Sequence, residues 1–485
     1  MNEIFNAINS FLGDILFFDI LFGTGGEAKI PFLVAWLIVG ALFLTIKMNF
    51  VNLHMLPHSY KIVMGKYATK EDKGLITPFQ SLTTALSATV GLGNIAGVAI
   101  AVSIGGPGAT FWMIIAGFLG MSMKFTEVTL SLQHREFLKD GTIMGGGMEY
   151  LSKGLANKGM PRFGKFLAIA FAFFMIGGAI GGGNTFQVSQ ALGVVSENIP
   201  FFKETPIAFG IIMAIAVGAV IIGGIKSIAK TTEKIVPTMV LIYVGASLYI
   251  LAINFTAIPA AFGLIFSEAF APTAVTGGII GVIVQGFKRA VFSSEAGLGS
   301  AGIAHAPAKV KYPVRQGMVS LYEPFIDTVI VCTMTALVIV ITGVYDPSNG
   351  HAALIEAQNG AALTSAAYGT VISWFPLILA ISIVLFAFST MISWSYYGER
   401  AWVYIFGTKS SIIFKLIFLG FTILGTVVST SIMVDFSFML ILGMALPNIM
   451  GLYILSGDVK EELDAYLKKL RSGELDREAI RNLDE

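Results

Sequence analysis

Long apolar runs dominate this chain, and short segments between the runs carry most of its charged side chains. An α-helix needs about 20 apolar residues to cross a hydrocarbon core of about 30 Å, and the runs have about this length. They predict eleven membrane-spanning helices, at residues 27–47, 77–104, 107–133, 163–193, 206–225, 233–253, 273–293, 316–343, 363–395, 410–429 and 432–455. The pattern is therefore that of an all-α polytopic membrane protein.

The run at residues 77–104 is interrupted near its middle by the string VGLGN, residues 90–94. Inside a bilayer a break in a helix is tolerated only where protein or an aqueous cavity covers the freed backbone groups. Amides freed at a half-helix N-terminus attract an anion such as a carboxylate, and freed carbonyls coordinate a small cation. The interruption therefore predicts a ligand site near the middle of the membrane.

The composition agrees with a membrane protein, because 55% of the residues are hydrophobic and only 13% are charged. A soluble domain carries about 25% charged residues. The single cysteine, Cys332, excludes an intrachain disulfide. Residues 1–26 are apolar but lack a basic segment, so they predict an interfacial helix on the outer face and no cleaved signal peptide.

The loop charges predict the orientation, because cytoplasmic loops retain lysine and arginine. With the N-terminus outside, only Lys29 and Lys203 of the 31 basic residues lie on the outer side. The charged tail, residues 456–485, is then cytoplasmic, and the protein is placed in the cell membrane. The basic residues follow this topology, so the lipid bilayer is an expected partner and nucleic acid is not.

The chain also shows signs of an internal duplication. The strings VGLGNIAGVA at residues 90–99 and AGLGSAGIAHA at 296–306 each begin a set of five predicted helices, 77–253 and 273–455. An odd number of helices in each repeat forces an inverted topology, in which the sites lie between paired discontinuous helices. The helix 27–47 is then an addition before the ten-helix core.

Several ordered motifs resemble the alanine or glycine:cation symporter family. They are VGLGN at 90–94, GGPGA at 105–109, KFTE at 124–127, FSSEAGLGSAGIAHAPAK at 292–309, PVRQG at 313–317 and FSTMISWSYYGER at 388–400. The family is similar in fold to the amino acid, polyamine and organocation superfamily. The resemblance implies a leucine-transporter-type fold of five-plus-five inverted repeats. It also implies sodium-coupled symport of a small neutral amino acid, alanine or glycine, with sodium as coupling ion and no other cofactor.

The resemblance implies that the amides of Gly91, Leu92 and Gly93 hold the substrate carboxylate. Glycine lets the backbone leave helical angles and approach a ligand closely. The alternative is that these glycines only permit tight packing between helices.

A sodium site is implied beside the same interruption. The carbonyls of Thr89 and Val90 would bind the ion, and Asn94 would serve either the ion or the substrate. Ser389 and Thr390 would add hydroxyl groups, because hard oxygen donors suit a small dehydrated cation. The alternative for both hydroxyls is a hydrogen bond to a carbonyl of their own helix.

Four further side chains are candidates for the substrate pocket, together with Thr390. Trp394 lies four residues after Thr390 and so on the same helical face, where it walls the pocket or packs at the interface. Asn184 and Gln187 are buried amides that need partners, either the substrate or a neighbouring helix. Phe287 is a candidate to cap the pocket.

Charged residues inside predicted spans are costly and point to function. Lys124 and Glu127 are expected to form an ion pair. Glu323 and Asp327 are expected to pair with Arg289 or Arg315. The alternative for Asp327 is that it binds a cation or a proton. Proton-coupled symport through Asp327 is therefore the second mechanism.

Other classes of function are disfavoured. The chain lacks the G-x-x-x-x-G-K-[ST] loop, so ATP is not expected to drive transport. It lacks H-E-x-x-H, which disfavours a membrane metalloprotease. A passive channel would need a continuous polar lining, and an enzyme would need a nucleophile and a base in one plane. The spans show neither feature.

Overall fold

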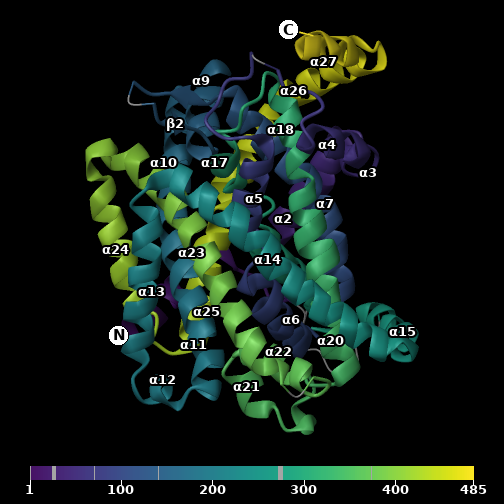
Figure 1. Cartoon of the computed structure of the whole chain (residues 1–485), viewed down its shortest axis with the longest axis vertical. Coiled ribbons are helices and arrows are strands. Elements are labelled where there is room, and N and C mark those ends of the chain that lie inside the picture. The colour runs from purple at the N-terminus through teal and green to yellow at the C-terminus, as the bar shows by residue number, and fades with distance from the viewer. Residues whose placement is uncertain are drawn as a thin grey trace.

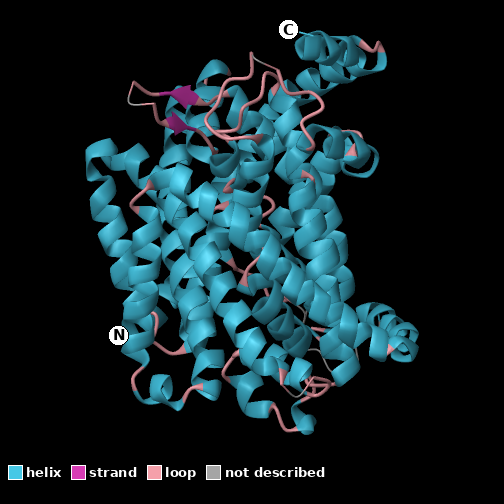
Figure 2. Ribbon diagram, viewed as in Figure 1, coloured by secondary structure: helices cyan, strands magenta, loops and turns pink. Residues whose placement is uncertain are grey.

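The computed structural model describes residues 2–24, 29–69, 71–139, 141–270, 277–372 and 374–484. The predicted starts of the spans 27–47 and 273–293 lie outside these residues. Helices make up most of the described chain, and one short antiparallel hairpin, β1 (Glu136–Phe137) and β2 (Ile143–Met144), lies at one end (Figure 2).

The first half of the chain forms α1 (Asn2–Leu16), α2 (Phe32–Lys47), α3 (Val51–His54), α4 (Leu56–Val63), α5 (Pro78–Thr89), α6 (Val98–Gly105), α7 (Ala109–Gln133), α8 (Gly147–Glu149), α9 (Leu155–Asn157), α10 (Pro161–Ile180), α11 (Phe186–Asn198), α12 (Pro200–Glu204), α13 (Pro206–Ile221), α14 (Gly224–Ile253) and α15 (Ile258–Phe270). The second half forms α16 (Gly278–Ser294), α17 (Ala301–His305), α18 (Pro313–Ser320), α19 (Tyr322–Pro324), α20 (Thr333–Thr342), α21 (Ala352–Glu356), α22 (Gly360–Gly369), α23 (Phe375–Phe406), α24 (Ser411–Leu424), α25 (Thr430–Gly443), α26 (Ala445–Arg471) and α27 (Glu474–Asp484).

Short π-helical and 3₁₀ segments interrupt or join these helices. The π-helical segments are η1 (Gly93–Gly97), η2 (Tyr150–Gly154), η3 (Gly181–Thr185) and η5 (Phe325–Cys332), and the 3₁₀ turns are η4 (Phe255–Ala257), η6 (Pro347–Asn349) and η7 (Thr408–Ser410). π-Helical turns inside α-helices are frequent at functional sites.

The long helices run between two ends of the molecule (Figure 1). We name the end with α27, α9 and the β1–β2 hairpin the C-terminal face, and the end with α12 and α21 the opposite face. Six helical stretches of the described chain are long and apolar enough to cross a membrane: Ala109–Gln133, Pro161–Asn198, Gly224–Ile253, Pro313–Thr342, Pro376–Phe406 and Thr430–Arg471. The all-helical membrane architecture is confirmed, whereas the number of eleven spans stays a prediction.

A seventh stretch of this kind is broken. Helix α5 and the segment Gly93–Gly105 form one apolar span that bends by 47°. Helices α14, α16, α22 and α23 pack around it, so the bend lies inside the bundle. The Thr364 hydroxyl of α22 donates to the Ile95 carbonyl of η1 at 3.0 Å, which satisfies one backbone group near the break.

The predicted span 363–395 is wrong as a single helix. The structure has α22 up to Gly369 and a separate helix, α23, from Phe375 to Phe406. Pro376 lies in the first turn of α23, where a backbone N–H has no partner within the helix. Inside a continuous helix the same proline would remove a hydrogen bond, so its position marks the start of a new helix. The apolar run continues through this boundary, so hydrophobic composition did not predict it.

The chain interrupts its helices a second time between α16 and α17. Glu295, Gly297 and Gly299 have φ angles of 58°, 87° and 78°, so residues 295–300 leave the helical path. After α17 the chain joins the segment before α5, because Lys309 N–H donates to the Ile76 carbonyl at 2.8 Å. The ends of both broken helices are thus tied together on one side of the bundle.

The surface of the bundle agrees with a lipid environment. Large apolar side chains are exposed on several long helices, including Ile215 of α13 at 68% and Leu241 of α14 at 70%. The described part of α1 packs against α25, where Asn9 Nδ2 donates to the Ile432 carbonyl at 3.4 Å. The interfacial position of residues 1–26 stays a prediction.

Candidate functional site

The first break lies at Val90, Gly91 and Leu92, between the end of α5 and the start of η1. Gly91 N–H donates to Asn94 Oδ1 at 2.8 Å, so the asparagine side chain closes the turn. The last carbonyls of a helix have no intrahelical partner. In the described part of the chain, no hydrogen bond reaches the carbonyl oxygens of Thr89 and Val90. These two oxygens are free to meet another ligand.

The predicted hydroxyl pair lies beside these carbonyls. Thr390 Oγ1 of α23 donates to the Ser87 carbonyl of α5 at 3.1 Å. Ser389 Oγ donates to the Phe386 carbonyl of its own helix at 3.0 Å, and its carbonyl accepts from Ser87 Oγ at 2.8 Å. The end of α5 and the middle of α23 therefore place two hydroxyl and several carbonyl oxygens together. The carbonyls of Ser87 and Phe386 were not among the predicted groups, because backbone oxygens carry no signal in a sequence.

The first break is also joined to Asp327. Asn94 Nδ2 donates to Asp327 Oδ1 at 2.6 Å and to its carbonyl at 3.0 Å. Ser293 Oγ and Thr328 Oγ1 donate to Asp327 Oδ2 at 2.9 and 2.7 Å. The position of a Cβ at Gly93 would be 3.2 Å from Ser293 Cα, so α16 touches the break closely. One amide and two hydroxyls thus surround the fully buried carboxyl group of Asp327.

Three predicted pocket residues meet at Gly91. A Cβ built there would lie 2.3 Å from Thr390 Oγ1 and 3.7 Å from Gln187 Oε1. Gln187 Nε2 donates to the Gly182 carbonyl at 2.8 Å, whereas its buried Oε1 has no partner in the described chain. One amide oxygen of Gln187 therefore remains available beside the break.

Trp394 and a glycine of η3 form the neighbouring wall. A Cβ at Gly183 would lie 2.3 Å from Trp394 Cβ, so the tryptophan packs directly against the glycine backbone. The Trp394 side chain is only 2% exposed, and its ring lies 5.5 Å from that of Tyr397. This close packing leaves no space for a side chain at position 183.

Two predicted pocket residues lie away from this meeting point. Asn184 Nδ2 donates to the Phe418 carbonyl at 2.6 Å, and its Oδ1 accepts from Thr422 Oγ1 at 2.9 Å. The asparagine therefore joins η3 to α24, which is the interhelical alternative. Phe287 lies seven residues before the end of α16, or about 10 Å along the helix axis.

Phe292 lies three residues before Glu295, where the second break begins, and it was not predicted. Its ring lies 5.2 Å from that of Phe186 and 4.2 Å from that of Phe438. A Cβ at Gly182 would lie 3.5 Å from its Cε2. Its position directly before the second glycine-rich string was the signal that could have identified it.

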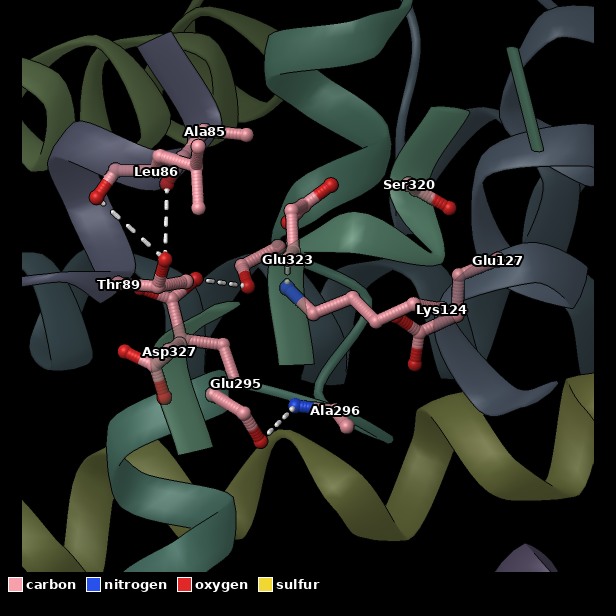
Figure 3. A network of polar contacts seen from close by, with 12 residues as sticks. Ala85, Leu86, Thr89, Lys124, Glu127, Glu295, Ala296, Ser320, Glu323 and Asp327 are labelled. Atoms are coloured by element: carbon pink, nitrogen blue, oxygen red, sulfur yellow. Dashed lines mark hydrogen bonds and ion pairs between the residues drawn. The ribbon is translucent and has the colours of Figure 1, made fainter. Parts of the chain in front are cut away.

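A buried ionic network lies next to Asp327 (Figure 3). The Lys124 ammonium donates to Glu323 Oε2 at 3.1 Å, and His305 Nε2 lies 2.5 Å from Glu323 Oε1. His305 Nδ1 in turn lies 2.6 Å from Gln316 Nε2 and 3.2 Å from Ser81 Oγ. The network joins α7, α17, α18, α19 and α5 by side chains that are not exposed to solvent.

The predicted ion pairs of Lys124 with Glu127 and of Arg289 with Glu323 or Asp327 are wrong. Lys124 pairs with Glu323 and not with Glu127, whose Oε1 accepts from Gly299 N–H at 3.1 Å and Asn448 Nδ2 at 2.7 Å. The Arg289 guanidinium lies 4.0 Å from the centre of the Phe438 ring. No ion pair joins Arg289 to Glu323 or Asp327 in the described chain, and charge alone had favoured that pairing.

Arg315 also lacks the expected pairing with Glu323 or Asp327. Its guanidinium donates to the Tyr67 carbonyl at 2.8 Å and lies 4.8 Å from the Tyr312 ring centre and 5.9 Å from that of Tyr466. Aromatic faces stabilise a guanidinium by cation–π attraction. The arginine therefore ties the segment before α5 to the C-terminal face.

Interrupted membrane helices with unpaired polar groups at the breaks define a membrane transporter rather than an enzyme. The family model described as "Sodium:alanine symporter family" matches residues 22–480. This chain belongs to the sodium:alanine symporter family.

Relatives agree with this assignment, and a solved structure shares the fold. The chain is 41% identical to the sodium/alanine symporter AgcS of Methanococcus maripaludis over 462 residues, which are 95% of this chain and 96% of that protein. It is 30% identical to the amino-acid carrier protein AlsT of Bacillus subtilis over 97% of this chain and 93% of that protein. The structure is similar to that of MhsT in complex with L-phenylalanine, with a TM-score of 0.59 over 85% of this chain and 98% of that chain at 15% identity. MhsT has the leucine-transporter fold, so the predicted fold type is supported.

Substituting Lys124→Met should lower the melting temperature of the purified protein in detergent. The change leaves Glu323 without its cation, and breaking a buried pair by removing one partner costs about 3–5 kcal/mol. The matched control is Lys66→Met, which breaks a half-exposed pair with Asp476 that contributes about 0–1 kcal/mol. Equal melting temperatures for the two variants would show that the Lys124–Glu323 pair does not stabilise the fold.

Proposed function

We propose that the protein carries a small neutral amino acid, alanine or glycine, into the cell together with sodium. The main support for this proposal is the arrangement of polar groups at the first break. Free carbonyl oxygens lie there together with the hydroxyls of Ser389 and Thr390 and the amides of Gly91 to Gly93. Membership of the sodium:alanine symporter family and the name of the archaeal relative agree with the ion and the substrate.

The substrate lies at the first break in this proposal. The backbone amides of Leu92 and Gly93 meet its carboxylate, joined by that of Gly91 when Asn94 Oδ1 releases it. The free Oε1 of Gln187 accepts a hydrogen bond from its ammonium group. Trp394 and Phe292 bound the side chain, and the close packing of Trp394 on Gly183 favours a methyl group or a hydrogen atom.

The coupling sodium lies between the end of α5 and the middle of α23. Its ligands are the carbonyls of Thr89 and Val90 and the hydroxyls of Ser389 and Thr390, which are hard oxygen donors. The ion and the substrate carboxylate then occupy the same interrupted segment with opposite charges. Each one raises the affinity of the other, and thermodynamic linkage makes the two effects equal.

Asp327 provides the alternative coupling mechanism. Its buried carboxyl group accepts three hydrogen bonds but forms no ion pair with any described basic side chain. An unpaired carboxyl in this position binds either a second cation beside Asn94 or a proton. Proton-coupled symport is therefore the second candidate, and the two mechanisms predict different driving gradients.

The proposal includes the number of membrane spans and their orientation in the cell membrane. Eleven spans form one added helix, 27–47, and two inverted five-helix repeats, 77–253 and 273–455. The C-terminal face, with the tail 456–485, is cytoplasmic, and the N-terminus lies outside with residues 1–26 at the membrane surface. Alternating access then moves the site at the first break between the two faces of the cell membrane.

Uptake of labelled alanine into proteoliposomes tests the proposal. An inward sodium gradient should cause accumulation, and an inward proton gradient without sodium should not. Accumulation with protons alone would assign coupling to Asp327, and absence of uptake under either gradient would contradict the proposed substrate.

Substituting Thr390→Ala should raise the sodium concentration for half-maximal uptake by about tenfold, because a lost ligand oxygen worth about 1.4 kcal/mol corresponds to that factor. The melting temperature without sodium should stay close to that of the unchanged protein. The control is Thr45→Ala, which removes a buried hydroxyl that bonds to the Ala41 carbonyl within α2. Unchanged sodium activation in Thr390→Ala would remove this hydroxyl from the ion site.

A further inference from the structure

A cavity of about 400 Å³ lies between α4, the start of α5 and the segment that joins α17 to α18, near the C-terminal face (Figure 1). Ligand pockets in proteins have volumes of about 300–1,000 Å³ and combine apolar walls with a few polar groups. The walls of this cavity are apolar and basic, and they include Ile62, Val63, Phe79, Val310, Lys309 and Arg315. No described residue of either break lines the cavity, so it is separate from the proposed transport site.

Arg315 brings a buried positive charge to the wall of this cavity, because the residue is only 2% exposed. Its Nη1 donates to the Tyr67 carbonyl at 2.8 Å and its Nε donates to the Tyr466 hydroxyl at 3.4 Å. No hydrogen bond joins its Nη2 to a described residue, and no ion pair reaches its guanidinium in the described chain. Arginine is almost never fully buried without a paired charge, and the planar fork of its N–H groups suits a phosphate. The free Nη2 therefore indicates an anionic ligand.

The charges that line the cavity do not cancel. Lys309 is exposed, and its ammonium group forms no hydrogen bond or ion pair with a described residue. Asp72 is the acidic residue among the described residues of the lining, and its two carboxylate oxygens accept from the Thr69 N–H at 2.8 Å and the Thr69 hydroxyl at 3.1 Å. Glu478 of α27 pairs with Lys311 at 2.6 Å. Two basic groups thus face one acid, so the cavity favours a negatively charged ligand.

The mouth of the cavity lies at the edge of the bundle. Met64, Phe79 and Lys309 line the cavity and are exposed, Met64 by 67% and Phe79 by 42%. Helix α4 packs against α18 and exposes Tyr60 and Lys61 on its outer side (Figure 1). A helix that exposes apolar and basic side chains together is typical of the boundary between the acyl chains and the head groups of a membrane. The mouth is therefore within reach of bilayer lipids.

We propose that this cavity binds an anionic phospholipid of the surrounding bilayer. The phosphate group lies at Arg315 Nη2 and Lys309, and an acyl chain packs on Ile62 and Phe79. Basic pockets between membrane helices hold anionic head groups in this way. The lipid joins α4 and the start of α5 to the segment before α18, where the Lys309 N–H already donates to the Ile76 carbonyl. The site binds neither the transported amino acid nor sodium, so it goes beyond the proposed function.

Thermal unfolding of the purified, delipidated full-length protein in detergent tests the site, because a ligand of the folded state raises the melting temperature. Phosphatidylglycerol should raise it with increasing concentration, whereas phosphatidylcholine, which has no net charge, should raise it less. Lys309→Gln should increase the phosphatidylglycerol concentration for the half-maximal shift by about fivefold, because one basic group at an anionic head group contributes about 1 kcal/mol. The control is Lys158→Gln, which removes an exposed lysine that pairs with Asp458 outside the cavity.

Equal shifts with the two phospholipids would overturn the anionic site, and so would a Lys309→Gln variant that responds like the unchanged protein. Inorganic phosphate should have no effect, and a shift of the same size with phosphate alone would show a free-phosphate site and overturn the lipid. Lys309 is the residue to change because it is exposed, whereas Arg315 also holds the Tyr67 carbonyl. The test contains neither sodium nor alanine, so its failure differs from failure of the proposed function, which would be a lack of sodium-driven alanine uptake.

Discussion

The interior of a bilayer offers no water to a backbone N–H or C=O group, and this constraint governs the two interrupted helices. Each break exposes carbonyl oxygens that the surrounding bundle must satisfy or leave for a ligand. At the first break, Asn94 closes the turn through Gly91, while α22 and α23 supply hydroxyl groups to nearby carbonyls. The carbonyls that remain free are those of Thr89 and Val90, so the structure confines the available oxygens to a small region beside two hydroxyls.

The buried polar groups divide into two sets with different physical roles. Lys124, Glu323 and His305 satisfy one another and hold α7, α19 and α17 together near the second break. The second set is incompletely paired. Two of its members, Gln187 Oε1 and the Tyr397 hydroxyl, have no hydrogen-bond partner in the described chain. Two others, the carboxyl groups of Asp327 and Glu295, form no ion pair with a described basic side chain. Paired groups stabilise one arrangement of the helices, whereas incompletely paired groups gain free energy when a ligand arrives.

Much of the fold was predictable, because hydrophobic spans and a glycine interruption depend on local sequence. The bend at VGLGN and the position of Thr390 beside it agree with the structure. The boundary between α22 and α23 was missed because the apolar run continues through it. The partners of Lys124, Asn184 and Arg315 were also beyond reach, since they depend on which helices become neighbours. Phe292 was overlooked in favour of Phe287 because the end of α16 could not be located from composition.

The central claim is that ion and substrate share the first break, and reciprocal binding tests it most directly. Alanine affinity of the purified protein is measured with and without sodium, and sodium affinity with and without alanine. A shared site predicts that each ligand raises the affinity of the other by the same factor. Alanine affinity that does not change with sodium would contradict the claim.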